Sequence, residues 1–180
     1  MRSHRSRRRE FEQVALAHLD EIYRYACRLT RQPSLAEDLT QETFLQAWSS
    51  FERFEPGTNC RAWLYRIFHH VYSHDRRRQS RDDRRVDLQD LPAHAIIFDP
   101  PLQRVFDHRL VADAFSELGS DARELILLAD VEGFTYREIA LLLEIPIGTV
   151  MSRLSRARKR LRMLLTSRAN ACGHARVSGE

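Results

Sequence analysis

The sequence predicts an all-α fold of two small helical bundles joined by a flexible linker. Apolar side chains recur at spacings of three and four residues in both halves of the chain, which is the period of a helix face. Capping-box pairs mark several expected helix starts, and no alternating strand pattern competes with them. The chain of 180 residues has only 6 Gly and 6 Pro, which also disfavours a turn-rich all-β fold.

Composition excludes several classes of protein. Hydrophobic residues make up 43% and charged residues 30%, so the chain can bury a hydrophobic core and is not disordered throughout. No apolar run approaches the ~18 residues of a membrane span, and no apolar segment follows the basic start, so we expect neither membrane insertion nor a secretory signal. The three cysteines are widely spaced without a CxxC pair, which favours a reduced, cytoplasmic protein without structural zinc.

The N-terminal half is predicted to hold a disordered basic leader followed by three helices in one bundle, residues 11–80. Pro33 is expected to break the first helix, and Ser34 with Glu37 forms a capping box for the second. A Pro56-Gly57 pair marks the loop before the third helix. The expected segments are the leader at 1–10 and helices at 11–29, 34–48 and 61–78.

The C-terminal half is predicted to begin after a linker at 81–104, which mixes Asp with Arg and has at most one short turn near 95–98. Asp121 with Glu124 forms an expected capping box, and Gly133 is expected to stop that helix. The expected segments are helices at 102–118, 121–132, 135–143 and 148–165, a domain at 105–167 and a disordered tail at 168–180.

The most informative segment is a helix-turn-helix near the C-terminus. Thr135 and Glu138 form a capping box, and Phe134 against Ile139 forms a hydrophobic staple. A turn containing Pro146 separates this short helix from the long helix that follows. Two helices joined by a short turn are the arrangement that places a second helix in the major groove of DNA.

The long helix has the two faces that a recognition helix needs. Its apolar stripe consists of Val150, Leu154, Ala157, Leu161 and Leu165. The remaining face has short hydroxyls near its start and long cations further on, which suits base edges and phosphates. The candidate DNA contacts on this helix are Thr149, Met151, Ser152, Arg153, Ser155, Arg156, Lys159 and Arg160. The alternative is a solvated basic face on an ordinary helical bundle.

Three motifs resemble one family. EIALLLEIPIGTVMSRLSRARKRLR closely resembles region 4 of extracytoplasmic-function (ECF) sigma factors, the small sigma-70 relatives of bacterial RNA polymerase. AEDLTQETFLQAW resembles the family's region 2.2, which binds core polymerase, and FEPGTNCRAWLYRI resembles its promoter-melting region 2.3. The resemblance covers residues 11–79 and 110–165. The GTN…RAWLYRI and PIGTVMSRL variants look most like the subgroup controlled by redox-sensing, zinc-containing anti-sigma factors.

The resemblance implies a cytoplasmic initiation factor that is not an enzyme and needs no cofactor. Its implied partners are core RNA polymerase, through the β′ clamp helices and the β flap, promoter DNA, and an anti-sigma factor. The implied polymerase-binding residues are Asp38, Gln41, Glu42, Phe44 and Leu45. The alternative is that the acidic residues are solvated or favour the helix dipole, and that Leu39 and Trp48 belong to the hydrophobic core.

Aromatic side chains lie among cations around the Pro-Gly loop, a combination that suits single-stranded DNA because bases stack and phosphates need counter-charge. By resemblance, this loop and the following helix capture a flipped base of the −10 element. The implied −10 contacts are Phe54, Thr58, Asn59, Arg61, Trp63, Arg66, His70, His74, Arg77 and Arg78. The alternative for Phe54 and Trp63 is a place in the hydrophobic core.

The chain departs from the family pattern at three places. His70 and His74 stand where the family usually has Asn or Asp, which puts the −10 base preference in doubt; they also form half a metal site, but no third ligand is evident and we expect no metal. Glu144 stands where the family has Gly at the turn, a position that can require positive φ. Cys60 replaces a common Leu and is expected to act as a small buried hydrophobe.

Two other functions are weighed against the sigma factor. A stand-alone helix-turn-helix regulator would bind duplex DNA alone, usually as a dimer, and would not need the N-terminal motifs. A hydrolase or nuclease could use His69, His70, His74 and the Asp-rich linker, but no nucleophile elbow, P-loop or complete metal motif is present in the sequence.

Overall fold

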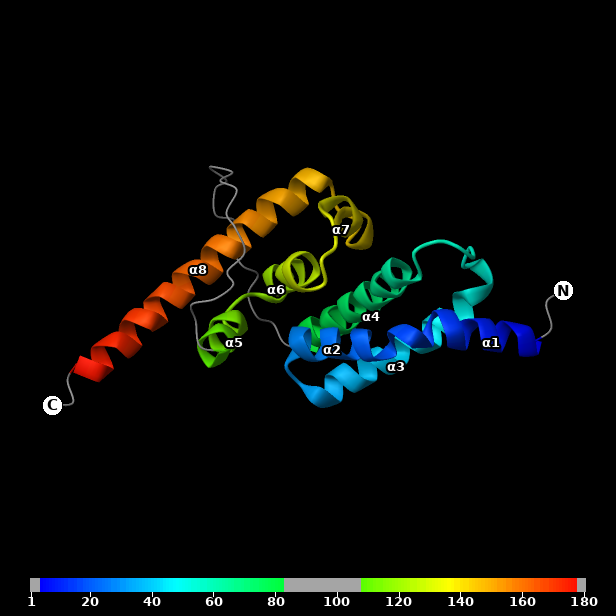
Figure 1. The fold of residues 1–180 in the computed structure, drawn as a ribbon, viewed down its shortest axis with the longest axis horizontal. Coiled ribbons are helices and arrows are strands. Elements are labelled where there is room, and N and C mark those ends of the chain that lie inside the picture. The colour runs from blue at the N-terminus through cyan, green and yellow to red at the C-terminus, as the bar shows by residue number, and fades with distance from the viewer. Residues whose placement is uncertain (1–3, 83–107, 178–180) are drawn as a thin grey trace. The chain divides into compact units, whose positions relative to one another are not determined.

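The computed structural model describes residues 4–82 and 108–177, and every regular element in these ranges is a helix (Figure 1). The chain folds into two compact units, the first built on α1 to α4 and the second built on α5, α6, most of α7 and α8. The predicted all-α fold is therefore confirmed. Most of the expected linker at 81–104, including the possible turn near 95–98, lies outside the described residues.

The first unit has four α-helices and two short 3-10 turns. Its elements are α1 (His4–Val14), η1 (Leu16–His18), α2 (Leu19–Thr30), α3 (Pro33–Ser50), η2 (Phe51–Arg53) and α4 (Cys60–Asp82).

The N-terminus of this unit differs from the sequence prediction. Residues expected to be a disordered leader form most of α1, and the single helix expected at 11–29 is divided by the 3-10 turn η1. Pro33 does not merely break a helix: it occupies the first turn of α3, where its missing N–H costs nothing. The predicted Ser34–Glu37 capping box is therefore wrong, because α3 begins before Ser34, with Gln32 at its N-cap and no capping side chain.

The hydrophobic core of the first unit lies among α2, α3 and α4. Tyr25 of α2 meets the rings of Tyr65 and Phe68 of α4 edge to face, at centroid distances of 4.9 and 5.2 Å. Ile22 and Leu64 are fully buried beside them. Each large apolar side chain removed from water stabilises the fold by about 1.5–3 kcal/mol. This cluster therefore determines which face of α4 is buried and which face remains exposed.

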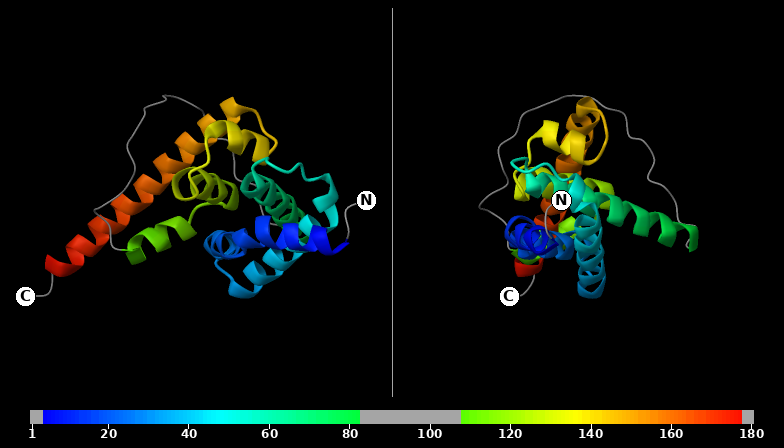
Figure 2. Two further views of the ribbon diagram at one scale, coloured as in Figure 1. Left: turned by 45° about the vertical axis from the view of Figure 1, so that its right-hand side comes forward. Right: turned by 90° about the vertical axis from the view of Figure 1, so that its right-hand side faces the viewer.

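The second unit contains the helix-turn-helix. Its elements are α5 (His108–Ser116), α6 (Ser120–Ile126), η3 (Leu127–Val131, one π-helical turn), α7 (Tyr136–Leu142) and α8 (Ile147–Val177). The left view of Figure 2 shows α8, orange to red, as one uninterrupted helix.

Local signals around α7 match the structure closely. The Thr135 N–H donates to Glu138 Oε2 at 2.8 Å, and the Glu138 N–H donates back to Thr135 Oγ1 at 3.3 Å, so this capping box is confirmed. Gly133 has φ +72°, as a helix stop requires. Glu144 has φ +55°, so the strained turn expected from the missing glycine is present.

Two predictions for the second unit are wrong. Asp121 and Glu124 do not form a capping box, because Gly119 occupies the N-cap of α6 and Glu124 is buried. The tail after residue 167 was expected to be disordered, but α8 continues to Val177. Arg168 carries the helix past the expected end, because it forms ion pairs with Glu117 and, at 3.4 Å, with Asp113.

Candidate nucleic-acid interface

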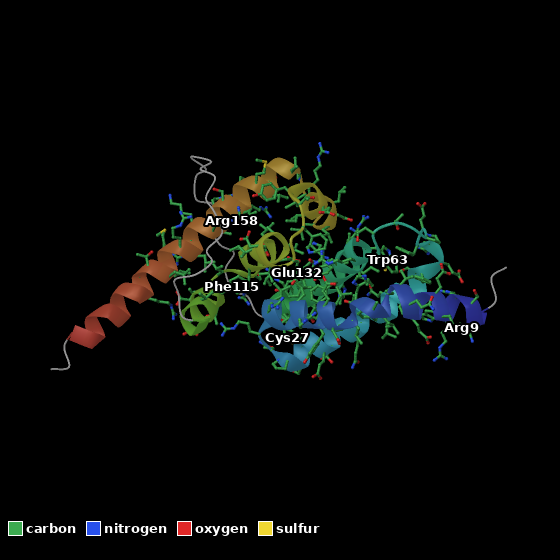
Figure 3. All side chains as sticks on the ribbon, in the orientation of Figure 1. Arg9, Cys27, Trp63, Phe115, Glu132 and Arg158 are labelled. Carbon is green, nitrogen blue, oxygen red and sulfur yellow. The ribbon has the colours of Figure 1, made fainter. Side chains whose placement is uncertain are left out.

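The loop between η2 and α4 is held by a group of aromatic rings. Phe54 stacks on Phe51 at 5.6 Å between centroids, and Trp63 tilts against Phe54 at 4.9 Å. Trp63, labelled in Figure 3, lies in the first turn of α4. Phe54 and Trp63 are both half-buried. Each ring therefore packs partly into the hydrophobic core, which was one prediction, and keeps an exposed part, which the predicted DNA contact requires.

Polar side chains of the same loop shape its backbone. Thr58 Oγ1 donates to the carbonyl oxygen of Glu55 at 2.7 Å, and Asn59 Oδ1 accepts the N–H of Ala62 at 3.0 Å. Asn59 thus caps α4, which satisfies one of the otherwise unpaired N–H groups at a helix start. Gly57, at φ +88°, supplies a backbone conformation that other residues rarely adopt. Thr58 and Asn59 remain exposed to solvent on the loop.

Arg61 is bound to α2, a contact that the sequence did not predict. Its guanidinium forms an ion pair with Glu21 and lies 5.1 Å from the ring centroid of Tyr65. The Tyr65 hydroxyl donates to the same Glu21 oxygen at 3.3 Å, and His18 Nδ1 lies 3.1 Å from the other oxygen. An Arg61 contact with DNA would therefore have to replace or share the bond to Glu21.

The carboxyl group of Glu21 is kept ionised by this cluster. Partial burial alone would raise the pKa of Glu21, but hydrogen bonds from Arg61 and His18 and the charges of both residues outweigh burial and lower the pKa. Glu21 and Arg61 are 40 residues apart in the sequence, so no local motif signals the pair.

Basic and imidazole side chains form an exposed row along α4. Arg66, His70 and His74 follow one another at intervals of four residues, which places them on one face of the helix, and all are exposed. Arg77 and Arg78 continue the exposed positive charge by one more turn, as predicted. In the part of the chain that the structure describes, no three His, Cys, Asp or Glu side chains gather as a metal site. Burial raises the pKa of the Cys60 thiol to about 11.

A second surface of the first unit lies on α3. Asp38, Gln41, Glu42 and Leu45 are exposed as predicted, and Leu45 is 62% exposed despite its apolar side chain. Phe44 is buried, so it belongs mainly to the hydrophobic core, yet its ring borders a hollow of about 350 Å³. The hollow is lined by Leu19, Thr40, Gln41, Phe44 and Leu45. Sequence reasoning missed Leu19 because it lies on α2, far from the α3 motif.

The long helix α8 has the two faces predicted for it. All five stripe residues are buried: Val150, Leu154, Ala157, Leu161 and Leu165. Outside this stripe, the exposed side chains include Met151, Arg153, Arg156, Lys159 and Arg160, of which Arg156 and Lys159 lie opposite the stripe. The hydroxyl residues Thr149, Ser152 and Ser155 are only half-buried, and Ser152 Oγ donates to the carbonyl oxygen of Thr149 at 3.1 Å. The cations therefore reach furthest from the helix.

Arg158 fixes α8 against the elements before it (Figure 3). Its Nη2 and Nε donate to the two carboxylate oxygens of Asp130 at 2.5 and 3.1 Å, and Nη1 donates to the Tyr136 hydroxyl at 3.2 Å. The hydrogen bonds that Arg158 donates to Asp130 raise the pKa of Arg158 above its usual value. This bidentate pair joins η3, the start of α7 and α8, and so holds the helix-turn-helix in one geometry.

Comparison with known proteins identifies both units. Residues 14–82 match the model of sigma-70 region 2, and residues 108–161 match that of sigma-70 region 4. An ECF RNA polymerase sigma factor EcfG from Rhodopseudomonas palustris is 31% identical over 83% of this chain and 82% of its own length. The chain belongs to the ECF family of RNA polymerase sigma factors.

Other relatives agree with this assignment. ECF sigma factor SigE from Mycolicibacterium smegmatis is 35% identical over 89% of this chain, which spans 63% of that relative's length. The solved sigma factor RpoE from Bartonella quintana, in complex with the anti-sigma factor NepR, has a TM-score of 0.68 and 32% identity, covering 87% of this sigma factor and 97% of that chain. CnrH, in complex with the cytosolic domain of CnrY, shares the fold at a TM-score of 0.61 and 24% identity, covering 89% and 90% of the two chains.

The region 2 match decides against the stand-alone regulator, because such a protein would not need the first unit of this sigma factor. None of these relatives is described as belonging to the subgroup with zinc-containing anti-sigma factors, which therefore remains an expectation. Among the described residues of the sigma factor, no helix has the length and apolar character to cross a lipid bilayer.

Proposed function

We propose that this chain is a dissociable initiation factor that binds core RNA polymerase and directs it to promoters with defined −35 and −10 elements. The observation that carries the proposal is the presence, in one chain, of two different surfaces whose side chains suit nucleic acid. One is an aromatic loop followed by a basic helix row, and the other is a helix-turn-helix with exposed cations. The factor acts in the cytoplasm and performs no catalysis, because polymerase supplies the chemistry.

Binding of core polymerase is assigned to the α3 surface. The hollow beside Leu45 and Phe44 can accept an apolar side chain, and Asp38 and Glu42 can pair with cations around it. The proposed occupant is the clamp-helix coiled coil of the β′ subunit. A helix with apolar and basic side chains would match both properties of this surface. The β flap is the proposed partner of the second unit.

Promoter recognition is assigned to the two units separately. In the first unit, the half-buried rings of Phe54 and Trp63 can stack against an unpaired base, and the α4 row from Arg66 to Arg78 can follow the backbone. In the second unit, Arg153 and Arg156 are placed to reach base edges, and Lys159 and Arg160 to bind phosphates. Base capture requires the duplex to open, which costs a few kcal/mol and needs polymerase to hold the strands.

An anti-sigma factor is the further proposed partner. The solved relative RpoE is bound by the anti-sigma factor NepR, and CnrH, which shares the fold, is bound by the cytosolic domain of CnrY. The exposed apolar surface around Leu45 would be available to an inhibitor when core polymerase is absent. We propose that the inhibitor and core polymerase compete for this chain.

The proposal is tested by one substitution on α3 and its control. Leu45→Glu places a charge beside the hollow, whereas Ser49→Glu places the same charge on an exposed position one turn further along. We expect Leu45→Glu to weaken binding of core polymerase at least tenfold, about 1.4 kcal/mol, and to lower promoter-dependent transcription in step. Ser49→Glu should change neither. Equal effects of the two variants, measured by fluorescence anisotropy of labelled protein, would contradict the α3 assignment.

A further inference from the structure

The basic N-terminal helix α1 is attached to the end of α3. Arg7 Nη2 donates to the carbonyl oxygen of Trp48 at 2.8 Å, and Arg7 Nη1 pairs with Glu52 Oε1 at 2.6 Å. The guanidinium also lies 4.7 Å from the ring centroid of Trp48. The Arg7 side chain is only 22% exposed, so these contacts hold it against the unit rather than in solvent.

Phe11, one helical turn further along α1, continues the attachment. Its ring meets Trp48 and Phe51 edge to face, each at 5.1 Å between centroids. Phe51 in turn stacks on Phe54, and Phe54 packs against Trp63. A continuous row of rings therefore runs from α1 through the end of α3 and η2 to the loop and the first turn of α4.

These contacts lie at the junction where the chain passes from α3 into η2 and then into the loop. The Trp48 carbonyl is in the last turn of α3, where it also accepts the N–H of Phe51 and where a cation is favourable. Glu52 lies in η2, directly after that turn. Arg7 thus joins the two sides of the junction. Phe11 packs against Phe51, so helix α1 contacts the ring on which Phe54 stacks.

We propose that α1 positions the −10 loop, with Arg7 and Phe11 as positioning residues for capture of the unpaired base. This inference rests on the proposed function, and it assigns a role to a helix most of which the sequence predicted to be a disordered leader. It differs from a direct electrostatic role, in which every arginine of α1 would contribute equally through phosphates. Arg8 provides the contrast, because it is exposed and pairs with Glu12 on its own helix at 2.8 Å.

The test compares Arg7→Ala with the charge-matched control Arg8→Ala and the conservative variant Arg7→Lys, in the full chain bound to core polymerase. A promoter labelled with 2-aminopurine in its −10 element reports strand opening, and the concentration dependence of the rate separates initial promoter binding from opening. We expect Arg7→Ala to slow opening about tenfold, the scale of one lost charge-assisted hydrogen bond, while initial binding changes less than twofold. Arg7→Lys should recover most of the rate, and Arg8→Ala should resemble the wild type.

Phe11→Leu is the second variant, because it keeps apolar volume and removes the ring contacts. We expect it to slow opening, with an unchanged helical circular-dichroism spectrum and easier acrylamide quenching of tryptophan fluorescence. Equal losses in Arg7→Ala and Arg8→Ala, a loss confined to initial binding, or unchanged opening in both Arg7→Ala and Phe11→Leu would overturn the proposal. A wild-type protein that opens no promoter would instead refute the proposed function, and the positioning role with it.

Discussion

Glu21 determines how firmly Arg61 is held at the start of α4. The folded-state pKa of Glu21 is lowered, so the stabilisation from its ion pair is fully present above the ordinary value of 4.5 and is lost as the pH falls through the lower folded value. We expect Glu21→Gln to lower the melting temperature at pH 7, and the gap from wild type to shrink as the pH falls below 4.5. Thermal melts followed by circular dichroism at pH 7 and pH 3.5 check this. A gap that widens in acid would contradict it.

Arg156 is the residue of α8 on which −35 recognition is expected to depend most. It is exposed near the start of the recognition helix, with Arg153 beside it. Arg156→Ala should cost about 1–3 kcal/mol of promoter binding and relax specificity at one or two base pairs, because a base contact is lost. Lys159→Ala should weaken all sequences alike and reduce the salt slope by about one, as a lost phosphate contact does. Holoenzyme binding to a library with a randomised −35 element distinguishes the two.

His70 and His74 lie in the exposed row of α4, and both are accessible to DNA. If they line the −10 site, replacing both with Asn should shift the preferred −10 sequence, because imidazole and carboxamide present different donor geometry to a base edge. The single and double variants should be compared on promoters with randomised −10 positions. An unchanged preference in the double variant would remove these residues as readers and leave recognition to the Phe54–Asn59 loop.

At the scale of elements, the Thr135 capping box sets the start of α7. Thr135→Ala removes the side-chain acceptor of the Glu138 N–H and is expected to lower the free energy of unfolding by about 0.5–2 kcal/mol. Thr166→Ala is the control, because Thr166 donates only to the Arg162 carbonyl oxygen within α8. Chemical denaturation of both variants measures the difference. A loss as large in Thr166→Ala would show that capping is not the cause.

Helix faces and helix starts that depend on short-range residue spacing could be predicted from the sequence. Helix starts that are decided by another residue nearby could not. The α8 stripe and the α7 capping box follow from short-range spacing, and both are present. The capping boxes proposed at Ser34 and Asp121 failed because α3 and α6 each begin at or before that residue, with Pro33 in the first turn of α3 and Gly119 at the N-cap of α6.

The features of the candidate site also divide into those that the sequence predicted and those that depend on tertiary contacts. Exposure of the α4 row and of the α8 cations could be derived from helical geometry alone. The ordering of α1 depends on Arg7 reaching Trp48, 41 residues away, and no local pattern contains that contact. The hollow on α3 requires Leu19 of α2, and the placement of Arg61 requires Glu21, so both needed the tertiary structure.

For the whole molecule, the basic side chains are divided between two units, and the formal net charge is only +4. The proposed DNA contacts are thus split between two small surfaces, and the one proposed on the first unit takes single-stranded DNA. We therefore expect the purified protein to bind promoter duplex weakly and to gain affinity when core polymerase joins the two contacts. Electrophoretic mobility shifts with and without core polymerase measure this. Tight, promoter-specific binding by the protein alone would favour the stand-alone regulator.

The central claim is that this chain directs polymerase to promoters. The most direct measurement is transcription of fragmented genomic DNA by purified core polymerase with and without the protein, followed by sequencing of RNA 5′ ends. We expect a discrete set of new start sites that share sequences near −35 and −10, and that lose the −35 consensus with the Arg156→Ala protein. Start sites that match those of core polymerase alone would contradict it.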